Sequence, residues 1–246
     1  MVFPAREWIL YSDDALLAVN KPAGLPALPD GYHPDAPHVK RVLEPGFGRL
    51  WIVHRLDRQT SGVMLLARSP QAHRALNDQF QSHQAIKVYH ALVLGTPAWD
   101  EMVVDLPLHP DGDRRHRTVV DQARGKPAVT RLRLIEHFAR FSLVEAIPQT
   151  GRTHQLRAHL SAVGFPIVCD PLYGGGMQFD NSSQPLGKNK SVTDLGGRLE
   201  RLGLHACKLE IEHPIDRSKM VFEAPYPSDF KLTLEFLRQN HPATLD

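Results

Sequence analysis

The sequence predicts an α+β fold built on a mixed, largely antiparallel central sheet with flanking helices and loops. Three observations support this class. Segments with β-branched residues or apolar–polar alternation mostly follow one another without a helix between them, whereas βαβ units need alternating strands and helices. Helical periodicity is limited to a few short segments. The 246 residues, 42% hydrophobic and 23% charged, match an ordinary globular chain that is long enough to bury a core.

The expected strands share alternation or a high content of β-branched residues. They are residues 8–11, 16–19, 62–67, 86–94, 116–120, 128–135, 141–147, 204–212 and 220–224. The first pair flanks Ser12-Asp13-Asp14, and the last pair flanks a turn around Pro214. Both pairs therefore predict hairpins.

Four segments carry helical signals. They are residues 38–43, 70–83, 153–163 and 229–237. Ser69 is a typical cap and Pro70 a typical first residue for the second helix, and Gly164 is placed to end the third. In the third helix, polar residues fall on one face and leucines on the other. That polar face looks either into a cleft or, as an arginine stripe, into solvent.

We expect residues 1–246 to form a single domain of two intimate sub-lobes. Residues from about 174 to 197 are polar and rich in glycine, and they predict a flexible insertion. This insertion either orders on a bound partner or is a surface loop without function.

Several classes of protein are not expected from the sequence. No apolar run approaches the roughly 20 residues of a membrane helix, and the first residues lack the pattern of a signal peptide. Cys169 and Cys207 stand alone, so a reducing cytoplasm is the simplest compartment. The 14 histidines show no ligand spacing, and no phosphate-binding glycine loop is present. We expect neither a metal nor a nucleotide cofactor.

The charge distribution is uneven. The net charge is +2, but residues 114–157 hold ten Lys or Arg against three acids, a local excess of seven. Arg131 and Arg133 alternate with leucines, so part of this charge lies along one strand face. Such a region predicts a surface that faces a polyanion, with scattered solvated charges as the alternative.

The run from His54 to Gly62 places Asp57 between Arg55 and Arg58. Opposite charges nearby lower a carboxylate pKa by roughly 1–3 units, which suits a nucleophile or base that must stay ionised. An ordinary surface ion pair is the alternative.

Three further segments, residues 19–24, 86–93 and 150–159, join this run. The ordered set resembles the RluA family of pseudouridine synthases from about Trp8 to about Pro225. The resemblance implies the pseudouridine synthase catalytic fold with a central cleft. It also implies an isomerase that converts uridine to pseudouridine in structured RNA (ribosomal RNA and/or tRNA hairpins), without a cofactor and with base flipping.

The resemblance assigns catalytic roles to three residues. Asp57 would act at the ribose, either on the anomeric carbon or by removing a proton from the neighbouring carbon. Tyr89 would stack on uracil and help to remove the proton from carbon 5. A tyrosine packed in the core is the alternative for this position. Arg157 would pair with the catalytic carboxylate.

The remaining site residues would bind RNA. Arg55 would fill the gap that the flipped base leaves, or it is simply an ion-pair partner of Asp57. Lys21 supports the floor of the site or a structural turn. The other expected phosphate or substrate contacts are Arg152, His154, Arg115 and Arg117. Solvated charge is the alternative for the last two. His54 is expected to hold the bend by hydrogen bonding.

Many relatives carry a small RNA-binding domain ahead of the catalytic region, and we expect none here, because the first family segment begins within about ten residues of Met1. RNA selection would then fall to the catalytic domain, acting as a monomer without a protein partner. Residues 125–130 support the subgroup that acts on tRNA and ribosomal RNA hairpins. The competing functions are an RNA-binding protein without catalysis and a metal-dependent hydrolase.

Overall fold

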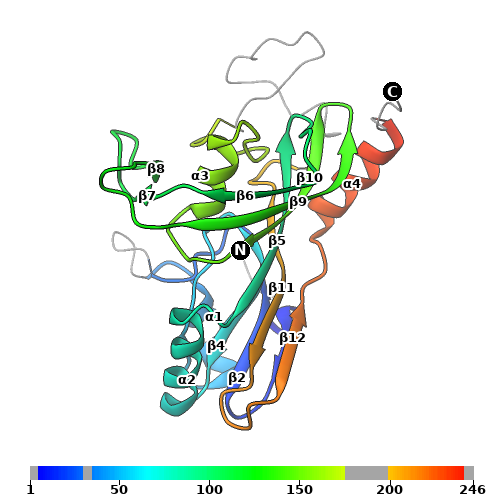
Figure 1. Ribbon diagram of the computed structural model, residues 1–246. Coiled ribbons are helices and arrows are strands. Elements are labelled where there is room, and N and C mark those ends of the chain that lie inside the picture. The colour runs from blue at the N-terminus through cyan, green and yellow to red at the C-terminus, as the bar shows by residue number, and fades with distance from the viewer. Residues whose placement is uncertain (1–4, 30–34, 175–198, 241–246) are drawn as a thin grey trace. The chain divides into compact units, whose positions relative to one another are not determined.

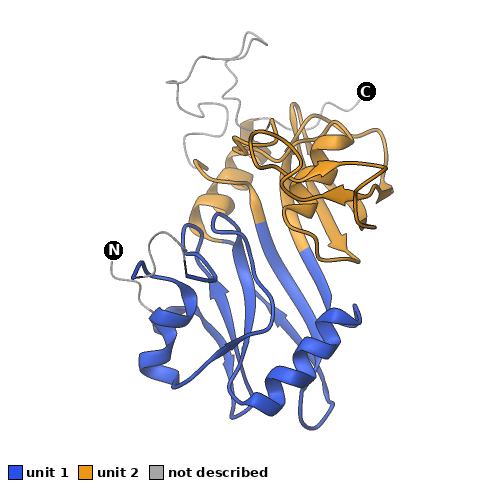
Figure 2. Cartoon of the chain, turned by 90° about the vertical axis from the view of Figure 1, so that its left-hand side faces the viewer, with its two compact units in different colours: residues 1–88, 205–226 blue, residues 89–204, 227–246 orange. Residues whose placement is uncertain are grey.

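The computed structural model describes residues 5–29, 35–174 and 199–240, and the chain divides into two compact units. Unit 1 comprises residues 1–88 and 205–226, and unit 2 comprises residues 89–204 and 227–246 (Figure 2). Most elements of both units are labelled in Figure 1.

Unit 1 is built on a sheet whose strands follow the order β1-β2-β4-β11, with β12 paired to β11 and β3 paired to β4. The strands are β1 (Ile9–Ser12), β2 (Leu16–Lys21), β3 (Trp51–Ile52), β4 (Ser61–Ala67), β11 (Leu204–Glu212) and β12 (Lys219–Glu223). All these pairs are antiparallel except β4 with β11. Every residue of β4 is buried, which explains its almost continuous apolar sequence.

Gly62 makes the parallel pairing of β4 and β11 possible. Ser61 lies opposite His205 and Gly62 lies opposite Ala206. The φ of Gly62 is +116°, and a Cβ at this position would overlap the carbonyl oxygen of Ala206. Beside it, the Oγ of Ser61 is 2.9 Å from the Nδ1 of His205. Ser61 and Gly62, at the end of the run from His54 to Gly62, thus allow the two strands to pack closely in the sheet.

Two helices, α1 (Val39–Phe47) and α2 (Pro70–Gln81), belong to unit 1, after a short 3-10 helix at Ala5–Trp8. The Oγ of Ser69 accepts the N–H of Ala72 at 3.1 Å, so the predicted cap of α2 is confirmed. Ala72 and Leu76 of α2 are fully buried in the core of the unit, against the sheet.

Unit 2 is built on a fully antiparallel run in the order β5-β10-β9-β6. Its strands are β5 (Ile86–Leu94, which begins in unit 1), β6 (Glu101–Asp105), β9 (Val129–Phe138) and β10 (Phe141–Pro148). A separate pair is formed by β7 (Leu108–His109) and β8 (Val119–Val120). The described residues of unit 2 also form the helices α3 (Gln155–Ala162) and α4 (Ser228–Asn240). Leu156 and Leu160 of α3 pack into its core.

The predicted α+β class with a mostly antiparallel sheet is confirmed. The strand expected at 116–120 is wrong, since only Val119–Val120 is a strand. The Oδ1 of Asp113 accepts the N–H groups of Arg115 and Arg117, and this turn competes with extended backbone. The predictions missed β3, β6 and β7. The insertion expected at about 174–197 lies, apart from Gly174, outside the described residues.

The third helix begins at Gln155, two residues later than predicted. The reason is His154, whose φ of +52° places it in the left-handed region. In the described parts of the chain, no helix is long and apolar enough to cross a membrane.

Candidate active site

Asp57 lies in the loop that connects β3 to β4, and backbone hydrogen bonds shape this loop. The carbonyl of Asp57 accepts the N–H of Thr60 at 3.1 Å. The neighbouring Arg58 exchanges two hydrogen bonds with Gly24: its carbonyl accepts the N–H of Gly24 at 2.8 Å, and its Nε donates to the Gly24 carbonyl at 3.0 Å. The half-buried Asp57 therefore sits on a loop that is tied to the segment after β2.

Lys21 lies under this pair of loops and is 0% exposed. Its Nζ donates to the carbonyls of Pro22 (2.8 Å), Leu25 (2.9 Å) and Arg58 (3.3 Å). A buried ammonium is tolerated only when its donors are satisfied, and here backbone oxygens satisfy it. This geometry suits support of the site floor. Contact between Lys21 and substrate stays a prediction.

His54 holds the bend, as the sequence predicts. Its Nε2 accepts the N–H of Leu65 at 2.9 Å, and its ring stacks on Phe80 with centroids 4.5 Å apart. Burial lowers the pKa of His54 to about 3, with a smaller contribution from the charge of Lys87. The imidazole is therefore neutral near pH 7. The cations adjacent to Asp57 in sequence are the exposed Arg55 and Arg58.

Tyr89 belongs to unit 2, where it lies on β5 opposite Ala146 of β10. The side chain is half-buried and packs against the apolar core of the unit. One part of the ring is thus held by the core while another part is accessible. This placement is compatible with both the core role and the stacking role expected for it.

Arg157 projects from α3 and is 8% exposed, so the exposed arginine stripe considered from the sequence is wrong. Its Nε and Nη2 donate to the Oδ2 and Oδ1 of Asp170 at 2.7 and 2.8 Å. Such a two-point pair fixes the plane of the guanidinium as well as its position. Asp170, which is 0% exposed, also accepts the N–H groups of Leu172 (3.0 Å) and Tyr173 (3.3 Å).

Tyr173 connects Arg157 to two other predicted site residues. The Cζ of Arg157 lies 4.9 Å from its ring centroid, and that of Arg117 lies 5.9 Å away. Its hydroxyl accepts the N–H of Thr118 at 2.8 Å and lies 3.1 Å from the Nδ1 of His154. Burial raises the pKa of Tyr173, so the hydroxyl keeps its proton near pH 7.

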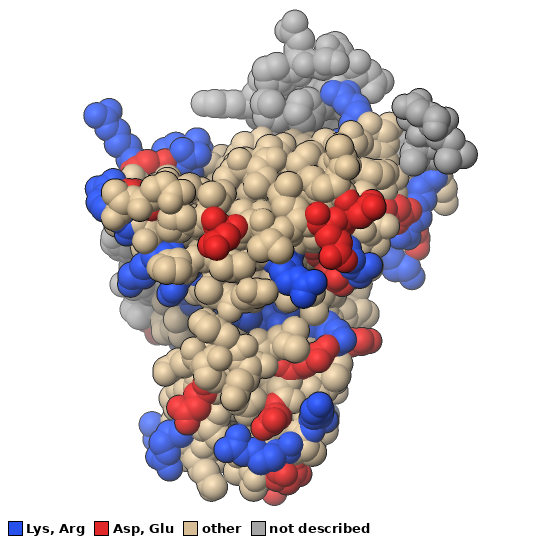
Figure 3. Space-filling view, viewed as in Figure 1, with Lys and Arg blue, Asp and Glu red and all other residues tan. Residues whose placement is uncertain are grey.

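The basic loop between β7 and β8 (residues 110–118) is anchored to the Asp170–Tyr173 segment. The Nη2 of Arg115 donates to the carbonyl of Pro171 at 2.9 Å, and the Nη1 of Arg117 donates to that of Leu172 at 3.0 Å. The Nε of Arg117 also donates to Asp113 at 2.7 Å. The structure thus brings Arg115, Arg117, His154 and Arg157 into one network. In Figure 3, basic side chains gather over the part of unit 2 that holds β7 and β8.

Arg152 lies just before α3, and part of its hydrogen-bonding capacity is used. Its Nε donates to the carbonyl of Pro127 at 3.0 Å, and its backbone N–H donates to the Oε1 of Gln155 at 3.0 Å. The backbone N–H of Arg152 is therefore already engaged within the turn before α3. Contact with phosphate would come from the rest of the guanidinium.

The sequence predictions missed Asp170 and Tyr173. Each lies in a short irregular segment without periodicity, and their partner Arg157 is more than ten residues away. The run Asp170-Pro171-Leu172-Tyr173 combines an acid, a proline and an aromatic residue, and this was the one available signal. Among the described residues, no group of three or more His, Cys, Asp or Glu side chains is placed to hold a metal ion.

Comparisons with known proteins agree with one another. A family model described as RNA pseudouridylate synthase matches residues 15–162. Ribosomal large subunit pseudouridine synthase D of Pseudomonas aeruginosa is 35% identical over 240 residues, which cover 96% of this chain and 73% of that protein. Synthase C of Vibrio cholerae is 38% identical over 234 residues, covering 94% and 69%. The solved structure of human RNA Pseudouridylate Synthase Domain Containing 4 matches with a TM-score of 0.75 at 26% identity, covering 95% of this chain and 94% of that chain.

Proposed function

The chain belongs to the family of RNA pseudouridylate synthases, and on this premise we propose that it modifies uridines of ribosomal RNA with Asp57 as the catalytic carboxylate. It is an isomerase that converts uridine to pseudouridine in RNA. The ribosomal substrate is supported by the relatives, whose names give the large ribosomal subunit as their target. The assignment of the carboxylate rests on one observation. The loop that holds Asp57 is hydrogen-bonded to the segment of residues 21–25.

The reaction needs no oxidant or external donor. The bond from the uracil nitrogen to the anomeric carbon breaks, the free base turns in place, and its carbon 5 forms a bond to the same ribose carbon. Carbon 5 then loses its proton, which completes the isomerisation. Asp57 either attacks the anomeric carbon or removes a proton from the neighbouring ribose carbon.

In this proposal Arg157 stabilises the charge of the catalytic carboxylate, and Tyr89 contacts the uracil base. Arg157 stabilises the ionised Asp57, and its guanidinium is already oriented by Asp170 and Tyr173. Tyr89 stacks on uracil and accepts the proton of carbon 5. A phenol is a weak base, which fits a step in which the uracil is held closely in place.

In this proposal, basic residues of the chain bind the phosphates of the RNA backbone. Arg115 and Arg117 of the β7–β8 loop, together with Arg152, contact phosphates, and each such contact adds a salt-sensitive increment of affinity. The exposed Arg55 fills the gap in the base stack after flipping. His154 and Lys21 support bound substrate. We extend the proposal to tRNA hairpins as a second substrate class, and to a single catalytic domain with a central cleft that acts as a monomer in the cytoplasm.

Substitution of Asp57 by Asn tests the function. Asp57→Asn keeps the size of the side chain but removes the negative oxygen, so pseudouridine formation should fall to background while RNA binding persists. The measurement is mass spectrometry of nucleosides from RNA incubated with the protein, together with a binding titration. Asp14→Asn is a matched control, because Asp14 is an exposed acid elsewhere in unit 1.

Two outcomes would contradict the proposal. Activity that survives Asp57→Asn removes the carboxylate assignment. A wild-type protein that binds RNA but never forms the carbon-linked nucleoside would be the non-catalytic RNA-binding protein considered above. Mapping of pseudouridine in total RNA from cells that lack the protein then identifies the target uridine.

A further inference from the structure

The tip of the β7–β8 loop presents an arginine that has no assigned role so far. The N–H of His116 donates to the carbonyl of Asp113 at 2.9 Å, which closes a β-turn with Arg114 and Arg115 at its two central positions. Both arginines are exposed. Within the parts of the chain that the structure describes, the guanidinium of Arg114 makes no hydrogen bond or ion pair.

Asp113 determines the shape of this turn. Its Oδ1 accepts the N–H of Arg115 at 3.0 Å and that of Arg117 at 3.1 Å, and its Oδ2 accepts the Nε of Arg117 at 2.7 Å. The N–H of Arg117 contributes most to holding the pKa of the Asp113 carboxyl below its usual range, so this carboxyl is ionised near pH 7. The turn is therefore built around one side-chain acceptor.

The two arginines that follow Arg114 fasten the loop. The Nη2 of Arg115 and the Nη1 of Arg117 donate to carbonyls of the Asp170–Tyr173 segment. The N–H of Gly112 donates to the carbonyl of Arg117 at 2.8 Å, and a Cβ at Gly112 would overlap a side chain of β8. Of the three arginines in this described loop, Arg114 is thus the one whose guanidinium is wholly available.

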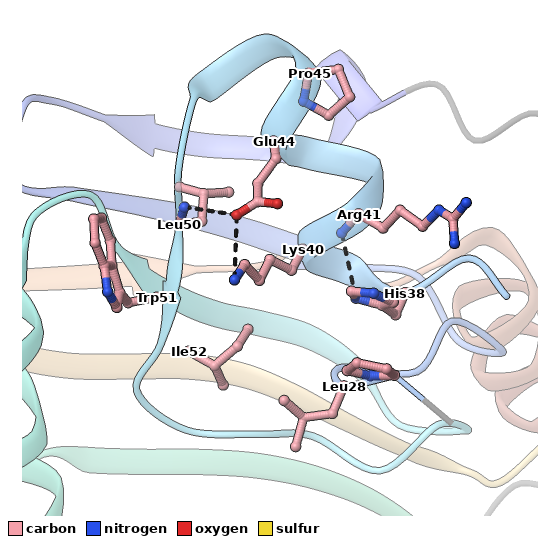
Figure 4. A pocket seen from close by; sticks show the side chains of 10 residues that line it. Leu28, His38, Lys40, Arg41, Glu44, Pro45, Leu50, Trp51 and Ile52 are labelled. Atoms are coloured by element: carbon pink, nitrogen blue, oxygen red, sulfur yellow. Dashed lines mark hydrogen bonds and ion pairs between the residues drawn. The ribbon is translucent and has the colours of Figure 1, made fainter. Parts of the chain in front are cut away.

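Cations at two other places are paired with acids. In the cavity that α1 and β3 line in unit 1, the Nζ of Lys40 lies 3.4 Å from Glu44 (Figure 4). Just after β8, the Nε of Arg124 lies 2.9 Å from the Oδ2 of Asp121. A paired cation must give up its acid before it binds a phosphate, whereas Arg114 loses no such contact.

We propose that the β7–β8 loop is a pre-formed phosphate-binding loop, in which Arg114 contacts the RNA backbone and Asp113 is the positioning residue. A guanidinium binds phosphate most strongly by two parallel hydrogen bonds, which need a defined orientation. A loop that is already ordered loses less conformational entropy on binding. Arg115 and Arg117 support the contact with the donors that anchoring leaves over. The inference rests on the proposed function, because it takes the ligand to be RNA.

Substitution of Asp113 separates charge from shape, because the two predict opposite results. Asp113→Ala removes an acid, so electrostatics alone would strengthen binding to a polyanion. It also removes the acceptor of two backbone N–H groups, so a pre-formed loop predicts a dissociation constant about 5- to 30-fold higher. Asp113→Asn removes the same charge but keeps an oxygen that can accept both N–H groups. This variant should bind RNA about as tightly as the wild type.

Substitution of Arg114 tests the phosphate contact through its salt dependence. Arg114→Gln should make the slope of log affinity against log salt shallower by about 0.7–0.9. The difference in affinity from the wild type should therefore narrow about threefold between about 50 and 200 mM salt. Arg74→Gln is the matched control, because Arg74 is an exposed arginine on α2 that, among the described residues, also has no hydrogen bond or ion pair. It removes the same charge and should keep the wild-type slope.

The probe is a labelled transcript of large-subunit ribosomal RNA, used for the dissociation constant and for KM and kcat of pseudouridine formation. KM should rise with the dissociation constant in Asp113→Ala and Arg114→Gln, whereas kcat stays within about twofold, as expected when only substrate binding is weakened. Thermal melting confirms that each variant is folded. If Asp113→Ala does not fold, the comparison of Arg114→Gln with Arg74→Gln decides.

Three results would overturn the inference. They are unchanged or tighter binding by folded Asp113→Ala, a wild-type salt slope in Arg114→Gln, and an equal loss of slope in Arg74→Gln. If the wild type makes no pseudouridine but Asp113→Ala and Arg114→Gln still weaken RNA binding, the proposed function fails and the phosphate-binding loop stands.

Discussion

Removal of the Asp170 carboxylate should destabilise the protein strongly. Asp170→Ala removes the carboxylate that the buried guanidinium of Arg157 meets at two points, and it also removes the acceptor of two backbone N–H groups. Breaking one side of a buried ion pair costs about 3–5 kcal/mol. In a chain of this size each kcal/mol lowers Tm by about 2–4 °C, so Tm should fall by about 6–20 °C.

A double substitution separates charge from packing. Asp170→Val with Arg157→Met replaces the pair by apolar side chains of roughly similar total volume, an exchange that is often neutral or stabilising for buried pairs. The N–H groups of Leu172 and Tyr173 still lose their acceptor, which costs about 1–3 kcal/mol. The double variant should therefore melt above Asp170→Ala, yet it should form no pseudouridine, because it lacks the arginine that we propose as the partner of Asp57.

The assay is a thermal and urea unfolding series on the wild type, the single variants and the double variant, with pseudouridine formation measured in parallel. Asp14→Asn is the control and should change Tm by less than 2 °C. The reasoning is refuted if Asp170→Ala melts within 2 °C of the wild type, or if the double variant is less stable than Asp170→Ala.

Three further perturbations follow from the same contacts. Gly62→Ala forces a Cβ against the Ala206 carbonyl at a φ of +116°. The free energy of unfolding, measured in urea, should therefore fall by about 1–3 kcal/mol or more. Tyr173→Phe leaves the buried N–H of Thr118 without its acceptor and should cost about 1–3 kcal/mol in the same assay. His54 has a folded pKa of about 3, below its unfolded value, so the unfolded state binds more protons between pH 6.5 and 3. Stability should therefore fall with decreasing pH in this window, by up to about 1.4 kcal/mol per unit, and His54→Gln should reduce that slope when unfolding is followed against pH.

Sequence patterns predicted the long elements well, because their signals are local. The alternation of β5 and the Ser69-Pro70 start of α2 located both elements to within two residues. The short strands β3 and β7, of two residues each, carry too little pattern to be recognised. The expected strand at 116–120 failed because a single acceptor, the Oδ1 of Asp113, bends the backbone into a turn.

The features of the candidate site also fall into those that local sequence predicted and those that only the tertiary structure shows. The sequence by itself determined the family segments, the bend that holds Asp57, and the hydrogen-bonding role of His54, since each depends on residues close together in the chain. Tertiary structure alone decided that Arg157 is buried against Asp170 and Tyr173, and that Arg115 and Arg117 anchor the β7–β8 loop to the same segment. The physical reason is that a buried charge needs a partner, but neither its distance along the chain nor its residue type follows from local propensity.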